Sequence, residues 1–186
     1  MISMCAGLLF AGCASLPTPS LPEREKVGNF ALEARFALRA QIPGQSMQSA
    51  GGRLSWEHRG DSDRLLISNP LGYGLARIEM TPARSRLESA DGQIRESGDP
   101  DALIEEVTGQ RLPIRRLPAW LLGRAAPGAQ IGHDPLARPS SLREAGWQID
   151  YAYDDDAPGA LPARLTLNRD GEIELRLRIE EWKEAP

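Results

Sequence analysis

The sequence predicts a mainly β fold, in which short helices cover the apolar face of a curved antiparallel sheet. Apolar and polar residues alternate through most of the 186-residue chain, which is typical of strands with one buried and one solvated face. The 18 glycines and 15 prolines provide many turns between short elements. Few segments have helical periodicity, so the helices are too few to form a complete second layer.

The alternating segments give the expected strands. The longest covers residues 30–42 and begins with Phe30. Asp-Gly pairs at 91–92 and 170–171 each lie between two alternating segments, which is a strong signal for a β-hairpin. We expect about nine or ten strands in all. The other alternating segments are residues 53–57, 64–68, 75–80, 86–89, 93–96, 147–153, 163–167 and 172–180.

One helix is expected directly after residue 99. Asp99 can accept a hydrogen bond from the first turn, and Pro100 suits the first helical position. Leu103 and Ile104 supply an apolar stripe, and Gly109 is suited to end the helix.

Two further helical segments are expected, at residues 118–123 and near 140–145. Trp120, in the first of these, could pack inward or face a ligand or a membrane. Because such short helices cannot fill a second layer, we expect an apolar hollow between them and the sheet. A β-sandwich with a filled core is the alternative that the pattern leaves open.

The N-terminal residues have the features of an export signal. Residues 1–12 are uncharged and apolar but too short to span a bilayer. Phe10-Ala11-Gly12-Cys13 resembles the bacterial lipobox, in which the cysteine sulfur receives a diacylglycerol. We therefore expect a signal peptide at 1–12, a lipid anchor at Cys13 with a proline-rich tether over 13–26, and a folded domain at 27–186. Ala14, where Asp would retain the protein in the inner membrane, favours the outer membrane.

Composition and motifs argue against several other functions. A net charge of −4 is unsuited to binding nucleic acid. Two histidines and two cysteines are too few for a zinc cluster. His133-Asp134 is the best acid–base pair, but no nucleophile motif lies beside it, so we interpret it as a solvated loop. We likewise place His58 at the surface and the acidic segment 154–156 in a surface loop. The sequence contains no nucleotide-binding loop and no hydrolase elbow. We therefore predict no enzyme activity and no metal site.

A set of short motifs, in order along the chain, resembles the LolB family of outer-membrane lipoproteins. The motifs follow the lipobox cysteine and a first strand that contains Phe36. They are Leu54-x-Trp56, Leu65 to Gly72, Thr108-Gly109, Leu112-Pro113-Ile114, Leu117-x-x-Trp120 to Gly123, Gly146-Trp147-x-Ile149-x-Tyr151, Leu161-Pro162 and a last strand that ends in Trp182.

The resemblance implies a fold, a location and a function. The fold would be an unclosed antiparallel β-barrel of the LolA/LolB type, with a helical lid over an apolar cavity. The protein would be a monomer, anchored in the outer membrane and facing the periplasm. It would accept acylated lipoproteins from the periplasmic carrier LolA and insert them into the outer-membrane lipid, with no cofactor.

Two groups of site residues follow from the resemblance and the alternation. Leu71, helped by Tyr73, would form the apolar tip of a protruding loop that aids release of cargo into the membrane. The alternative is a leucine folded back onto the sheet edge. The acyl-binding cavity would be lined by Phe30, Leu32, Phe36, Leu38, Leu54, Trp56, Leu103, Ile104, Trp120, Leu121, Ile149, Tyr151, Leu175 and Leu177.

Three competing functions remain open from the sequence. One is a soluble LolA-like carrier with the same fold, for which Cys13 would carry no lipid. Another is a structural envelope lipoprotein that binds protein or peptidoglycan. The third is an envelope hydrolase that uses His133 and a carboxylate.

Overall fold

The protein is described by a computed structural model that covers residues 23–41, 44 and 46–185. The expected signal peptide, Cys13 and most of the tether fall on residues 1–22, which lie outside the described residues. In the described part of the chain, no helix is long and apolar enough to cross a bilayer.

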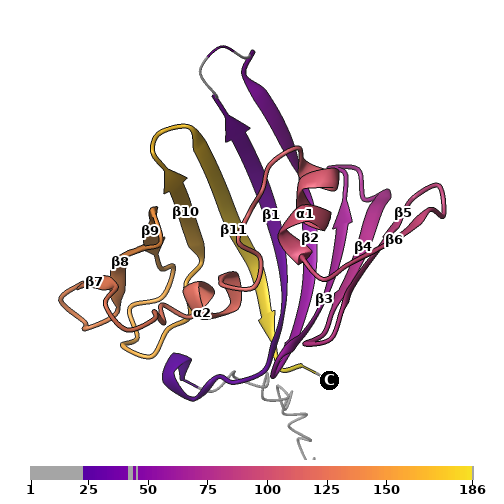
Figure 1. The fold of residues 1–186 in the computed structure, drawn as a ribbon. Helices are drawn as coiled ribbons and strands as arrows, with labels where there is room; N and C mark the ends of the chain where they lie inside the picture. Colours follow the sequence, from indigo (N-terminus) through magenta and orange to yellow (C-terminus); the bar gives the residue numbers. More distant parts are fainter. Residues whose placement is uncertain (1–22, 42–43, 45, 186) are drawn as a thin grey trace, which may run out of the picture.

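The described residues form one sheet of eleven antiparallel strands (Figure 1). The spatial order is β6-β5-β4-β3-β2-β1-β11-β10-β9-β8-β7, so β1 pairs with the last strand at the middle of the sheet. The strands are β1 (Phe30–Ala40), β2 (Gln48–Arg59), β3 (Ser62–Ser68), β4 (Gly74–Met80), β5 (Ser85–Ser89), β6 (Ile94–Ser97), β7 (Gln130–His133), β8 (Pro139–Glu144), β9 (Trp147–Ala152), β10 (Arg164–Arg169) and β11 (Ile173–Lys183).

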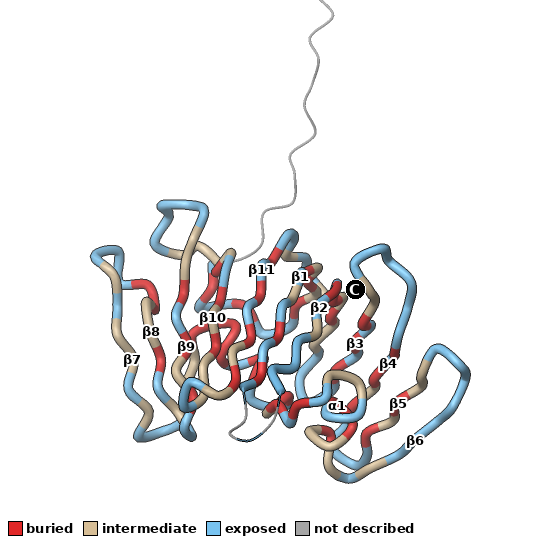
Figure 2. The backbone as a smooth tube through the Cα atoms, turned by 90° about the horizontal axis from the view of Figure 1, so that it is seen from above, coloured by how far each residue is buried: buried red, intermediate tan, exposed pale blue. Residues whose placement is uncertain are grey.

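The sheet is curved but not closed. Figure 2 shows the strands along an arc whose two ends, β6 and β7, remain apart. This confirms the predicted fold class, an unclosed antiparallel β-barrel. A β-sandwich would need two sheets packed face to face, and the described strands belong to one, so that alternative is wrong.

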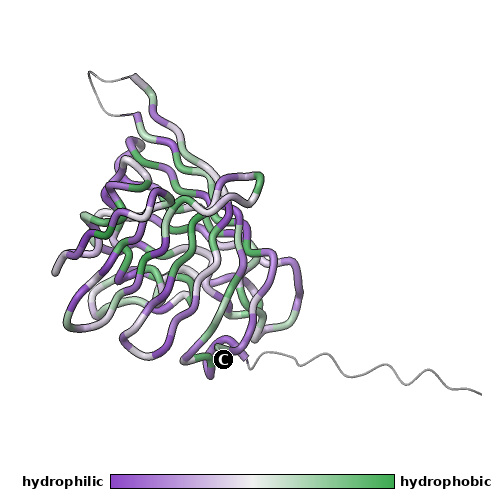
Figure 3. Tube along the Cα trace, turned by 90° about the vertical axis from the view of Figure 1, so that its right-hand side faces the viewer, coloured by the Kyte–Doolittle hydropathy of each residue, from purple (hydrophilic) through white to green (hydrophobic). Residues whose placement is uncertain are grey.

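Hydrophobic and hydrophilic residues alternate along the strands (Figure 3), and the burial patterns place the apolar ones on the inner face. On β3, for example, Leu65 and Ile67 are buried, whereas Arg64, the residue before Leu65, is exposed. The inner face contacts α1 (Pro100–Thr108), α2 (Leu117–Leu121) and the segment between them. A short 3₁₀ helix, η1 (Arg24–Lys26), precedes β1.

Helix α1 begins and ends where the sequence predicts. The Asp99 side chain accepts a hydrogen bond from the backbone N–H of Asp101, and Pro100 occupies the first turn. Gly109 has φ of +74°, a left-handed conformation that glycine adopts without strain.

The predictions for residues 130–145 are wrong in two respects. The helical turn near 140–145 is strand β8, and β7, which contains His133, was not anticipated. Leu142 of β8 pairs with Ile149 of β9. Pairing with β9 therefore decides the conformation of a segment whose local pattern is weak.

Candidate functional site

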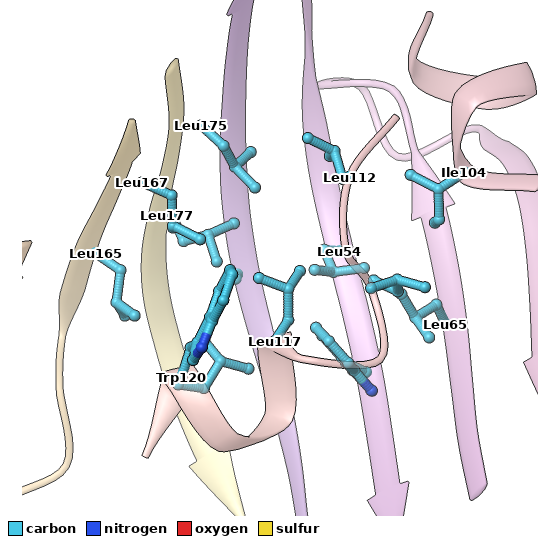
Figure 4. Close-up of a cluster of buried hydrophobic side chains, with 14 of the residues drawn as sticks. Leu54, Leu65, Ile104, Leu112, Leu117, Trp120, Leu165, Leu167, Leu175 and Leu177 are labelled. Carbon is cyan, nitrogen blue, oxygen red and sulfur yellow. The ribbon is translucent and has the colours of Figure 1, made fainter. Parts of the chain in front are cut away.

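An apolar hollow of about 40 Å³ lies between the inner face of the sheet and the helical segment. Strands β1, β2, β3 and β11 form its floor, and α1 with residues 112–117 forms its roof. Its lining residues are Phe36, Leu54, Trp56, Leu65, Ile67, Ile104, Thr108, Leu112, Ile114, Leu117, Leu175 and Leu177. Figure 4 shows several of these side chains converging from both sides on the same space.

Six residues predicted to line a cavity surround this hollow, namely Phe36, Leu54, Trp56, Ile104, Leu175 and Leu177. The others belong to the buried core around it and not to its lining. They are Phe30, Leu32, Leu38, Leu103, Trp120, Leu121, Ile149 and Tyr151.

Sequence reasoning missed half of the lining. Leu65 and Ile67 alternate within a predicted strand, so the alternation could have identified them. Leu112 and Ile114 lie in an irregular segment whose position over the sheet follows from tertiary packing. The missed residues are Leu65, Ile67, Thr108, Leu112, Ile114 and Leu117.

The hollow is too small for an acyl chain as it stands. A volume of about 40 Å³ is large enough for only a few water molecules. A leucine-lined cavity that binds one benzene molecule has on the order of 150 Å³. The roof must therefore move before a long acyl chain can enter.

Helix α2 is fixed to β8, β9 and the 3₁₀ helix by hydrogen bonds that involve buried side chains. Trp120 Nε1 donates to Glu144 Oε2 at 3.0 Å, and the Tyr151 hydroxyl donates to the Trp120 carbonyl at 2.8 Å. Arg116 forms an ion pair with the other oxygen of the Glu144 carboxylate. Arg24 Nη1 donates to the Leu122 carbonyl at 3.0 Å. Trp120 thus points inward, which settles the question that the sequence left open.

The environment of Glu144 favours its ionised form. Burial by itself would raise the pKa of this carboxyl. The hydrogen bonds from Trp120 Nε1, the Ala126 backbone N–H and Arg116 outweigh that effect and lower the pKa below its ordinary value. Burial raises the pKa of the Tyr151 phenol, which therefore stays protonated and able to donate.

Helix α1 is held by buried apolar side chains and by polar contacts. Arg95 of β6 lies 3.0 Å from Glu106, and both side chains are about half exposed. Gln110, just after the helix, donates to Gln48 Oε1 of β2 at 3.0 Å. Leu103 and Ile104 are its buried apolar contacts. The roof is thus attached at both helices, and the ion pair between α1 and β6 is its half-exposed contact.

The loop between β3 and β4 presents an apolar side chain to solvent. Leu71 is 83% exposed and Tyr73 is 71% exposed. Asn69 Oδ1 accepts hydrogen bonds from the Leu71 and Tyr73 backbone N–H groups at 2.9 and 3.1 Å. Gly72 has φ of +91° and donates to the Asn69 carbonyl. The loop is therefore ordered, and Leu71 is not folded back onto the sheet edge.

Asp134 and His58, two of the candidate acid–base groups, have structural partners. Asp134 lies 2.8 Å from the Arg138 guanidinium, while His133 is an exposed residue of β7 rather than of a loop. The surface position predicted for His58 is wrong, because its side chain is only 15% exposed. Its Nδ1 lies 2.8 Å from Asp63 Oδ1, the same oxygen that accepts from Trp56 Nε1.

The described acidic groups do not assemble a metal site. Among the described residues, no group of three or more His, Cys, Asp or Glu side chains could hold a metal ion. Asp154 of the acidic loop is paired with Arg164 and Arg178. A larger recess of about 420 Å³ near the β2–β3 turn is lined partly by charged residues such as Asp61 and Arg115, so its chemistry does not suit acyl chains.

Comparison with known proteins identifies the family. The family model "Outer membrane lipoprotein LolB" matches residues 28–182. The outer-membrane lipoprotein LolB of Dechloromonas aromatica is 64% identical, over 96% of this chain and 94% of that protein. That of Bordetella petrii is 37% identical, over 88% and 84%. A crystal structure of a LolA superfamily protein from Nitrosomonas europaea superposes with a TM-score of 0.48 and 13% identity, over 84% of this chain and 86% of that one. The chain belongs to the LolB family of outer-membrane lipoproteins, non-enzymatic receptors in lipoprotein localisation.

Proposed function

We propose that this receptor takes acyl chains of lipoproteins from a soluble carrier of the LolA type into the space beneath α1. It then releases them into the outer membrane at the Leu71 loop. The observation that supports this most strongly is the apolar hollow, whose roof helix α1 is joined to β6 by a half-exposed ion pair. Phe36, Leu54 and Leu177 would contact the acyl chains once the roof has moved.

Burial of acyl chains supplies the driving force. Each methylene group removed from water contributes about 0.8 kcal/mol, so a few long chains bind strongly to an apolar space. The sequence has no nucleotide-binding motif, so transfer proceeds by differences in affinity. The receptor must hold cargo more tightly than the carrier does and less tightly than the bilayer.

The proposal includes the anchor. Residues 1–12 would be removed as a signal peptide, and Cys13 would carry the lipid at the beginning of a tether over residues 13–26. Mass spectrometry of the protein from bacterial membranes should find an acylated Cys13. An unmodified Cys13 on a periplasmic protein would instead indicate the soluble carrier.

Leu71→Glu tests the release step. The side chain contacts solvent, so the variant should fold and take up a diacylated lipoprotein from the carrier as the wild type does. A charged tip cannot enter the bilayer, so delivery of cargo to outer-membrane vesicles should fail. Leu136→Glu, at an exposed position near β7, is the matched control. Normal delivery by Leu71→Glu would refute the role of the loop.

A further inference from the structure

Two leucines lie on the outer face of the sheet, where alternation places polar residues. Leu66 of β3 and Leu75 of β4 are each 42% exposed. Leu66 is directly opposite Arg77, two residues from Leu75, and both leucines line the same shallow recess. The strand β4 continues from Tyr73 and Gly74, so these leucines lie next to the Leu71 loop. We call Leu66 and Leu75 the outer leucine pair.

The segment that contains the outer leucine pair and the Leu71 loop carries no charge, which suits contact with a lipid surface. The sequence has no charged residue from Leu65 to Ala76 and has arginines on both sides, Arg64 and Arg77. Both arginines have carboxylate partners, because Arg64 lies 3.4 Å from Glu57 and from Glu79, and Arg77 lies 4.0 Å from Glu88. An arginine can keep its guanidinium at lipid headgroups while its methylenes cover apolar surface.

The length of chain before the described residues allows a side of the sheet to contact the membrane. Phe30 and Asp63 both pair with His58, so they lie at the same level of the sheet. From Asp63 to Ser68, below the Leu71 loop, the strand rises about 17 Å. The ten residue-to-residue steps from Cys13 to Glu23 span at most about 35 Å. An anchor at Cys13 therefore keeps both ends of strand β3 within reach of one bilayer.

We propose that the outer leucine pair is a second lipid-contact surface, continuous with the Leu71 loop. The receptor then rests on the bilayer with the outer face of β3 and β4, in addition to inserting one loop tip. The occupant is a lipid surface. This inference rests on the proposed membrane role of Leu71 and extends it from a point of contact to an area.

Binding of single-residue variants to lipid vesicles tests the proposed lipid-contact surface. The chain from residue 13 onward would carry Cys13→Ala, so that binding depends on the folded domain and not on an acyl anchor. Vesicles of phosphatidylethanolamine and phosphatidylglycerol are sedimented with the protein. Leu66→Glu and Leu75→Glu should each weaken binding about tenfold, a change of about 1.4 kcal/mol. Leu136 is 37% exposed and lies in the turn between β7 and β8, at the opposite edge of the sheet. Leu136→Glu should therefore bind vesicles like the parent chain.

The outcomes separate this inference from the proposed function. If Leu71→Glu loses vesicle binding while Leu66→Glu and Leu75→Glu retain it, the loop alone inserts and the inference is wrong. If Leu71→Glu also retains binding, both proposals fail. Unchanged vesicle binding with weaker self-association, measured by sedimentation velocity, would assign the leucines to a contact between copies and overturn the lipid surface. Circular dichroism melts establish that each variant is folded.

Discussion

Asp63 is a carboxylate on the inner face of β3, where its neighbours in the alternation, Leu65 and Ile67, are apolar. It is buried because its Oδ1 accepts a hydrogen bond from Trp56 Nε1 and lies within hydrogen-bonding distance of His58 Nδ1. The alternation could predict the burial of Leu65 and Trp56. It could not predict the polar partner that Trp56 requires, because that pairing depends on the register of β2 against β3.

Asp63→Ala should destabilise the fold. It removes the acceptor of a buried indole N–H, and an unsatisfied buried donor costs about 1–3 kcal/mol. Urea unfolding should give a free energy of unfolding lower by that amount. Asp61→Ala, at an exposed position in the adjacent turn, should change it far less. Equal effects at the two positions would contradict the assigned role of Asp63.

Glu144 should make stability depend on acid pH. Its folded-state pKa is lowered, so its contribution is complete above the ordinary value of about 4.3 and is lost as the pH falls through the lowered pKa. We expect Glu144→Gln to lower the free energy of unfolding at pH 7 and to lower it much less at pH 3. Urea titrations of both proteins at the two pH values measure this. A difference that does not change with pH would contradict the prediction.

The two helices of the roof differ in how much of their position the local sequence predicts. For α1, capping residues and an apolar stripe were sufficient to predict its bounds. For β7 and β8 the local pattern was not sufficient, because their pairing with each other and with β9 decides their conformation. The apolar stripe of α1 is visible in the sequence. The buried bonds that fix α2 involve Arg24, Glu144 and Tyr151, which are distant in the chain.

Hydrogen exchange should distinguish α1 from α2. Local opening is easier where few buried contacts are broken. We therefore expect backbone amides in Pro100–Thr108 to exchange faster than those in Leu117–Leu121, as measured by mass spectrometry. Addition of a diacylated lipopeptide should raise the exchange of α1 further and leave α2 unchanged. Equal protection of both helices would mean that the roof moves as one body.

At the scale of the whole molecule, the open curved sheet followed from alternation, Asp-Gly turns and the shortage of helices. The apolar hollow was predicted as well, but its size was not. Its volume depends on how closely the segment Leu112–Leu117 packs over Leu54 and Leu177, and side-chain packing of this kind leaves no periodic signal in the sequence.

A crosslink between sheet and roof should stop uptake. Gln110, just after α1, donates a hydrogen bond to Gln48 of β2 and so joins the roof to the sheet. Gln48→Cys with Gln110→Cys, joined by a short bismaleimide, should lose uptake of acylated cargo, while the same double variant before crosslinking should retain it. Gel-shift transfer from the carrier measures both states. Uptake by the crosslinked protein would show that cargo enters by another route.

The pairing of β1 with β11 has a consequence for how the protein reaches its native state. Chain export proceeds from the N-terminus, so β1 to β6 and then β7 to β10 emerge as two separate groups of hairpins. The two groups can join into one sheet only after Ile173–Lys183 has emerged, because this strand pairs with β1 on one side and with β10 on the other. Such long-range pairing slows folding. A chain truncated before residue 173 would therefore yield two sheet fragments with open apolar sides, a natural substrate for periplasmic proteases.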